Sequence, residues 1–343
     1  MAWFRQKKGE ILKIKKVSIP QEAGIFLVFF VMVLIFSVLS ENFFTITNAS
    51  VLLLNGAIIA LIALGQTFVL LTGGIDLSTG ANVAMCGIIA TVLMRSGLPW
   101  WVAAIGAALC GSFLGVLNGL IIHYVGIPPF IVTFAAMGVA SSIPMIITRA
   151  ESIQITQEKF AWIGQGHVLG FPVPVILVII AAIISSILLK NTVLGTHIYA
   201  LGGNKLAARL SGINVMRTTV FVYAFSGFLA GVAGVIATSR LNVGYPQTGT
   251  GNQLFYSIAA AVVGGVSLFG GIGTIRGAIA GVLLISTISN GMNVVNVSSY
   301  WQPLVIGLII LGGVSIDSKR SSKRDGAKSK PRGKPQILSR TKK

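Results

Sequence analysis

The chain has 343 residues, of which 54% are hydrophobic and only 10% are charged. Soluble domains carry roughly 25% charged residues, so this composition nearly excludes a soluble enzyme. A net charge of +18 is typical of nucleic-acid-binding proteins, but we expect no such role, because 17 of the 26 Lys and Arg residues lie in the two terminal tails.

The middle of the chain consists of apolar segments separated by short polar or glycine-containing breaks. A transmembrane helix needs about 20 predominantly apolar residues, and these segments are near that length. We therefore predict an all-α, polytopic membrane protein with about ten transmembrane helices. Because some breaks contain only a glycine or a proline, eight or nine helices are an alternative. The segments are 24–40, 50–72, 75–95, 99–125, 128–148, 171–189, 218–238, 252–270, 274–292 and 299–315.

The positions of Lys and Arg predict the topology, because cytoplasmic loops and tails carry the excess of basic residues. With both termini in the cytoplasm, the inside segments hold 22 Lys and Arg and the outside loops hold four. The basic tails also suit anionic lipid at the cytoplasmic surface. We predict a basic cytoplasmic tail at 1–23 before an uncleaved first span, a transmembrane domain at 24–315 with a cytoplasmic loop at 190–217, and a basic tail at 316–343 that we expect to be disordered.

No metal, nucleotide or other cofactor site is predicted in this chain. Cys86 and Cys110 lie in apolar segments without Cys or His neighbours at metal-ligand spacing, so we expect small buried side chains. The glycine-rich run at 264–273 lacks the Gly-Lys-Ser/Thr ending of a phosphate-binding loop. Glycines at four-residue spacing instead predict close helix packing at Gly111, Gly115 and Gly119, at Gly227 and Gly231, and at Gly273, Gly277 and Gly281.

The segment Gly73–Gly80 interrupts two apolar segments and contains Asp76, the only acidic residue within the predicted spans. Intramembrane charges are rare and often functional, so Asp76 and Ser78 are candidates for a translocation pathway or gate. Alternatively, either side chain caps the helix that follows. Further polar residues in the spans extend the candidate pathway, although an interhelical hydrogen bond is the favoured interpretation for each. These residues are Gln66, Asn82, Asn118 and Asn290.

The predicted cytoplasmic loop 190–217 is basic and contains no acidic residue. From Asn204 its pattern predicts a short helix with one apolar face, bounded by glycine turns. Such a helix between two spans can transmit motion from a soluble partner, and a helix that rests on lipid fits the pattern equally well. The apolar face consists of Leu206, Leu210 and Ile213, and the turns of Gly202, Gly203 and Gly212.

Several motifs together resemble one family, the permease subunits of ribose/xylose-type bacterial ABC importers. The motifs are Gly-Gly-Ile-Asp-Leu-Ser at Gly73–Ser78, Ile-Tyr-Ala-Leu-Gly-Gly-Asn and Ala-Ala-Arg-Leu-Ser-Gly-Ile-Asn within Ile198–Asn214, Asn290–Asn293 and Val297–Gln302. The resemblance covers about 24–318 and implies a type II ABC importer-like permease in the bacterial inner membrane, without catalytic activity. It implies three partners: a second permease copy or homologue, an external sugar-binding protein, and a cytoplasmic ATPase that binds the ATP and Mg.

The family's ATPase-docking loop maps onto the short helix of the cytoplasmic loop. The implied coupling residues are Gly202, Gly203, Asn204, Leu206, Ala207, Ala208, Arg209 and Gly212. Leu206 stands where the family usually has Glu, which removes the basis for a docking salt bridge there. Gln253 and Phe255 stand where the family usually has acidic residues, so the resemblance does not specify which sugar is transported.

Three alternatives to the sugar permease are open from the residues alone. They are an ion-coupled secondary transporter that uses Asp76 as its coupling group, a permease of the same family for a different small polar solute, and a membrane scaffold without transport.

Overall fold

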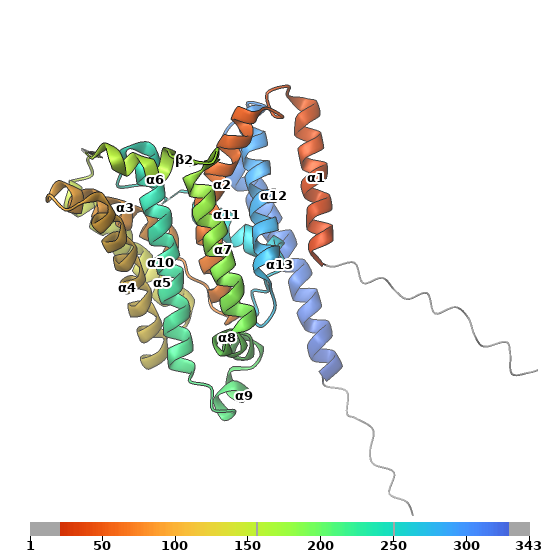
Figure 1. The fold of residues 1–343 in the computed structure, drawn as a ribbon. Helices are drawn as coiled ribbons and strands as arrows, with labels where there is room; N and C mark the ends of the chain where they lie inside the picture. Colours follow the sequence, from red (N-terminus) through yellow and green to blue (C-terminus); the bar gives the residue numbers. More distant parts are fainter. Residues whose placement is uncertain (1–20, 156, 250, 329–343) are drawn as a thin grey trace, which may run out of the picture.

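The computed structural model describes residues 21–155, 157–249 and 251–328, and its long helices lie side by side as a bundle (Figure 1). The helices are α1 (Gln21–Leu39), α2 (Ile46–Leu71), α3 (Thr79–Arg95), α4 (Trp100–Tyr124), α5 (Pro129–Thr148), the 3-10 helix Glu158–Phe160, α6 (Ala161–Gln165), α7 (Val173–Asn191), α8 (Val193–Gly203), α9 (Lys205–Leu210), α10 (Val215–Leu241), α11 (Gln253–Val263), α12 (Ile275–Val294) and α13 (Trp301–Lys328). Two short antiparallel pairs join β1 (Ile153–Gln154) to β4 (Val243–Gly244) and β2 (His167–Val168) to β3 (Phe171–Pro172).

The prediction of a polytopic helical membrane protein is confirmed in part, because the described residues are mostly helical and several of the helices are long and apolar. Among the described residues, six helices are long and apolar enough to cross a membrane, namely α2, α4, α5, α7, α10 and α12. The helices α1, α3, α11 and α13 contain shorter apolar stretches. Each predicted segment therefore overlaps one helix, but the described residues do not establish ten full spans.

Helices α2 and α10 form the centre of the bundle. Every residue of α2 from Gly56 to Leu71 is buried, and α10 packs against α2, α3 and α4. Helices α4 and α5 lie toward one edge, and α1 and α13 lie at the opposite edge (Figure 1). Helices α8 and α9 lie together at one end of the bundle, which the charge pattern predicts to be cytoplasmic, and α6 lies near the other end (Figure 1).

Three boundaries correct the predictions. Helix α11 ends at Val263 rather than near 270, because Gly265 adopts φ +87° and its N–H donates to the carbonyl oxygen of Val262. Helix α3 begins at Thr79 rather than at 75, since residues 72–78 form a non-helical break. The tail expected to be disordered from 316 is helical through Lys328, because its Ser, Lys, Arg and Ala residues can continue α13. The rest of that tail and the tail at 1–20 lie outside the described residues.

Candidate functional site

The break between α2 and α3 contains Asp76, whose side chain is only 1% exposed. Oδ1 of its carboxylate accepts hydrogen bonds from the backbone N–H of Ser78 at 3.0 Å and from the Ser78 hydroxyl at 2.6 Å. Oδ2 accepts from the hydroxyl of Ser226 in α10 at 3.0 Å. These bonds replace the water that a buried carboxylate loses. Asp76 therefore binds the start of α3 and ties it to α10, whereas the Ser78 side chain makes no capping bond.

Side chains from three further helices bind the same break. Asn118 of α4 donates to the Ser78 hydroxyl at 3.1 Å, and Thr133 of α5 donates to the carbonyl that precedes Asp76, also at 3.1 Å. Gln66 of α2, with its amide in the orientation that satisfies both polar atoms, donates to Asp76 O and accepts from Asp76 N–H at 3.2 Å each. Four helices thus hold one irregular segment inside the bundle, where membrane proteins tolerate such backbone.

Asn82 lies one turn into α3 and bridges α4 and α10. Its Nδ2 donates to the carbonyl oxygens of Gly111 and Gly227 at 3.2 and 3.3 Å, and its Oδ1 accepts from the thiol of buried Cys86 at 3.2 Å. A Cβ atom on either glycine would collide with the backbone of the other. The predicted glycine-mediated helix packing is confirmed at this contact.

Asn290 lies apart from the other predicted pathway residues. It is in α12 and donates from Nδ2 to Oδ1 of Asn48 in α2 at 2.8 Å. The structure brings Asp76, Ser78, Gln66 and Asn118 together and places Asn82 beside them, and all six predicted residues are buried. They form hydrogen bonds between segments of the chain, which the sequence favoured for the four Asn and Gln residues, whereas for Asp76 and Ser78 its alternative to a pathway role was a helix cap.

Sequence reasoning missed Ser226 and Thr133, which bind the break from α10 and α5. A search for every hydroxyl in a predicted span would have found both of them. Such a search also returns many hydroxyls that only bond the preceding turn of their own helix, such as Ser141. A hydroxyl within a predicted span is therefore a sequence signal for such residues, but it does not distinguish them from hydroxyls that bond only their own helix.

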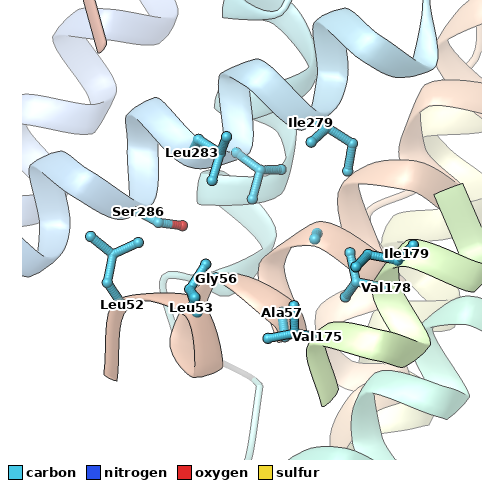
Figure 2. A pocket seen from close by; sticks show the side chains of 12 residues that line it. Leu52, Leu53, Gly56, Ala57, Val175, Val178, Ile179, Ile279, Leu283 and Ser286 are labelled. Atoms are coloured by element: carbon cyan, nitrogen blue, oxygen red, sulfur yellow. The ribbon is translucent and has the colours of Figure 1, made fainter. Parts of the chain in front are cut away.

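An apolar cavity of about 190 Å³ lies between α2, α7 and α12 (Figure 2). Its lining includes Gly56, Val178 and Leu283, and the hydroxyl of Ser286 has no hydrogen-bond partner among the described residues. A sugar requires several polar partners, so this lining suits hydrocarbon. Within the described ranges, no group of three His, Cys, Asp or Glu side chains is placed to hold a metal ion.

Helices α8 and α9 form the predicted coupling segment, and Asn204 joins them. This residue ends α8, and its Oδ1 caps α9 by accepting a hydrogen bond from the backbone N–H three residues later at 2.9 Å. Gly202 and Gly203 belong to α8 and do not form the predicted turn. The glycine at 202 instead permits close packing, since a Cβ atom there would overlap the carbonyl oxygen of Leu71 at the end of α2. Gly212, with φ +82°, does form the predicted turn after α9.

Helix α9 attaches to the bundle through its small residue and exposes its large ones. Ala208 is buried against Leu201 and Val215. Leu206 and Leu210 are 68% and 80% exposed, and Lys205 and Arg209 beside them are also exposed. The helix lies at the very end of the bundle (Figure 1). Its apolar side chains are therefore available to another molecule.

Comparison with known proteins identifies the family. The family model described as "Branched-chain amino acid transport system / permease component" matches residues 48–313. The chain is 39% identical to the D-allose transport system permease protein AlsC of Escherichia coli over 296 residues, which cover 86% of this chain and 90% of that protein. It is 41% identical to the ribose import permease protein RbsC of Bacillus subtilis over 307 residues, with coverage of 89% and 95%.

A third relative is the L-arabinose ABC transporter permease protein AraH of Azospirillum brasilense, which is 36% identical over 306 residues, or 89% of this chain and 90% of that protein. No solved structure matches the chain. The relatives are permease components and not enzymes, and the matched region runs from α2 into α13. The resemblance found in the motifs is thereby confirmed, and the chain belongs to this family of transport-system permease components.

Proposed function

We propose that the chain is the membrane-spanning permease subunit of an ATP-driven importer for a monosaccharide of the ribose/xylose class. The relatives support this substrate class, because their names specify D-allose, ribose and L-arabinose, which are all uncharged monosaccharides. The permease acts in the bacterial inner membrane with both termini in the cytoplasm. It performs no catalysis, and a partner ATPase binds the ATP and Mg.

The pathway lies between two permeases, either two copies of this chain or this chain and a homologue. Two observations within one chain support this assembly. The side chains of Ser78, Asn118 and Ser226 around Asp76 are occupied by hydrogen bonds within the protein, and the cavity beside α7 is apolar. Each therefore offers a sugar few free hydrogen-bonding groups: the hydroxyl of Tyr223 beside the break, and that of Ser286 in the cavity. An external binding protein delivers the sugar to the pathway. The Asp76 network shapes this pathway indirectly, by fixing the position of the break at 72–78.

The observation that carries the proposal is the exposed pair Leu206 and Leu210 on α9. A cytoplasmic ATPase that covers these side chains can move α9 and, through Asn204, α8. Because the backbone of Gly202 packs against that of Leu71, a shift of α8 displaces the end of α2. The residues that follow Leu71 are the break that holds Asp76, so α8 connects the docking surface to the gate in the folded chain.

The test replaces both leucines in the variant Leu206→Glu/Leu210→Glu. Burying a carboxylate in an apolar interface is unfavourable, and each 1.4 kcal/mol lost weakens docking about tenfold. We expect at least a tenfold loss of copurified ATPase and of ATP-dependent uptake of labelled D-ribose, D-allose and L-arabinose in proteoliposomes. The amount of permease in the membrane should not change, because neither side chain supports the fold.

Leu169→Glu is the matched control, since Leu169 is 95% exposed in the turn between β2 and β3. This variant should copurify the ATPase at the level of the unchanged protein. Normal copurification and uptake in the double variant would refute the docking role of α9. Failure of the unchanged chain to copurify any ATPase would refute the importer itself.

The same proteoliposomes test the ion-coupled alternative. If Asp76 coupled ion movement, uptake would follow an imposed proton or sodium gradient without ATP, and Asp76→Asn would abolish it. We expect uptake to depend on ATP alone, because the Asp76 carboxylate is already bound by Ser78 and Ser226.

A further inference from the structure

Asp317 lies beyond the apolar stretch of α13 and binds the glycine-rich loop between α11 and α12. Its Oδ2 accepts hydrogen bonds from the hydroxyl of Ser267 at 2.9 Å and from the backbone N–H of Leu268 at 3.1 Å. The same hydroxyl accepts from the N–H of Phe269 at 3.2 Å, and Ser267 is buried. Asp317 therefore belongs to the bundle, although the sequence assigned it to a tail outside the transmembrane domain.

The loop that Asp317 binds also contacts both α2 and α8. The N–H of Gly271 donates to the carbonyl oxygen of Leu71 at 2.9 Å, and the hydroxyl of Tyr199 in α8 donates to that of Gly273 at 2.9 Å. A Cβ atom on Gly271 would lie 3.0 Å from the backbone of Gly203. At Gly271 the loop thus meets Gly203 of α8 and Leu71 of α2 backbone to backbone, so no side chain lies between these segments to absorb a displacement.

The two breaks in the bundle are held in the same way. In the break at 72–78, Asp76 accepts from a serine hydroxyl and a backbone N–H. In the loop after α11, Asp317 accepts from a serine hydroxyl and a backbone N–H. The two breaks meet where Gly271 binds Leu71. A carboxylate that accepts two hydrogen bonds fixes an irregular segment more firmly than a neutral acceptor.

We propose that Asp317 is a positioning residue for coupling: through Ser267 it fixes the glycine-rich loop against α8 and α2, so that movement of α8 is transmitted to α13. This inference rests on the proposed function of the chain as an ATP-driven permease. Without the Asp317 contact, the ATPase would still dock on α9, but α13 would not follow.

The first test measures amide hydrogen–deuterium exchange of the detergent-solubilised full chain, with Asp317→Ala and Ser267→Ala as variants. We expect exchange in 265–273 to increase by about tenfold, and exchange in 199–203 by about threefold, because opening of the loop exposes the amides behind it. Faster exchange in the loop alone would overturn the inference, since Asp317 would then stabilise only its own neighbours.

The second test measures labelled D-ribose uptake per ATP hydrolysed by the reconstituted complex, and D-allose and L-arabinose are measured in parallel. In Asp317→Ala this ratio should fall about tenfold while the ATPase remains bound. Asp317→Asn should retain most of the ratio, because its amide oxygen can still accept from Ser267. A merely structural role would lower the amount of complex and leave the ratio unchanged, and that result would overturn the inference.

Ser315→Ala is the matched control in both measurements. Its exposed hydroxyl donates only to Leu311 O in its own helix, so neither the exchange nor the ratio should change. If Asp317→Ala fails to insert into the membrane, both measurements are made on Ser267→Ala instead. This variant keeps the hydrogen bond from the N–H of Leu268 to Asp317. Absence of ATPase from the unchanged complex would refute the proposed function, and the exchange measurement would still decide whether Asp317 holds the loop against α8.

Discussion

The variant Ser226→Ala tests whether the Asp76 carboxylate holds α3 to α10. It removes the hydrogen bond that Oδ2 of Asp76 accepts from α10 at 3.0 Å and leaves that oxygen buried. Hydrogen bonds to charged groups contribute about 1.5–3 kcal/mol, so we expect the free energy of unfolding to fall by that amount. Equilibrium unfolding in mixed detergent micelles, followed by tryptophan fluorescence, measures the change.

Ser112→Ala is the matched control, because the Ser112 hydroxyl likewise ties another helix, α4, to α10 but donates to a neutral acceptor, the carbonyl oxygen of Ala224 at 3.1 Å. A neutral hydrogen bond contributes about 0.5–1.5 kcal/mol. Ser226→Ala should therefore destabilise the chain by about 1 kcal/mol more than Ser112→Ala. Equal losses in the two variants would contradict the charged bond at Ser226.

A double-mutant cycle with Asp76→Asn isolates the charge. The carboxamide retains the shape of the side chain and can still bond Ser78, but it is neutral. In this background, the effect of Ser226→Ala should fall to about 0.5–1.5 kcal/mol. The reasoning is refuted if Ser226→Ala has the same effect with Asp76 and with Asn at that position.

Two further variants test the packing of the bundle. Gly115→Leu should abolish accumulation of folded chain in the membrane, because a Cβ atom there would overlap the carbonyl oxygen of Tyr223, whereas Gly138→Leu, which has open space around it, should accumulate normally; immunoblots of membrane fractions compare them. Asn290→Ala should lower the free energy of unfolding by about 0.6–1.7 kcal/mol, through loss of its bond to Asn48, and an unchanged unfolding midpoint would contradict this.

The bundle was predictable because hydropathy depends on local composition. Each predicted segment overlaps a helix, and the errors lie at glycines and at a helix that continues into a polar tail. The early end of α11 depends on the positive φ of Gly265, and the sequence does not specify which glycine of a glycine-rich run adopts it. The close approach of Gly202 to Leu71 depends on the packing of α8 against α2, which hydropathy does not report.

The polar residues of the site were predictable, but their partners were not. Asp76 is conspicuous as the only acid within the predicted spans, whereas Ser226, its partner in α10, is 150 residues away in the sequence. The apolar face of α9 illustrates the same limit. Its sequence pattern is equally compatible with a helix that rests on lipid and with one that binds a protein partner. The structure adds that Ala208 attaches the helix to the bundle while Leu206 and Leu210 are exposed.

The contact at Leu71 is the reason that we expect the two breaks to respond together. Its carbonyl oxygen accepts from Gly271 and lies against the backbone of Gly202, so three segments meet without an intervening side chain. Close-packed backbones have few alternative arrangements, and a displacement of one segment therefore moves its neighbours or breaks the contact. The two carboxylates, Asp76 and Asp317, bind on either side of this contact. Loss of either carboxylate should loosen the segment that it binds and weaken the contact at Leu71. Because α8 takes part in that contact through Gly202, hydrogen exchange in α8 is the decisive measurement.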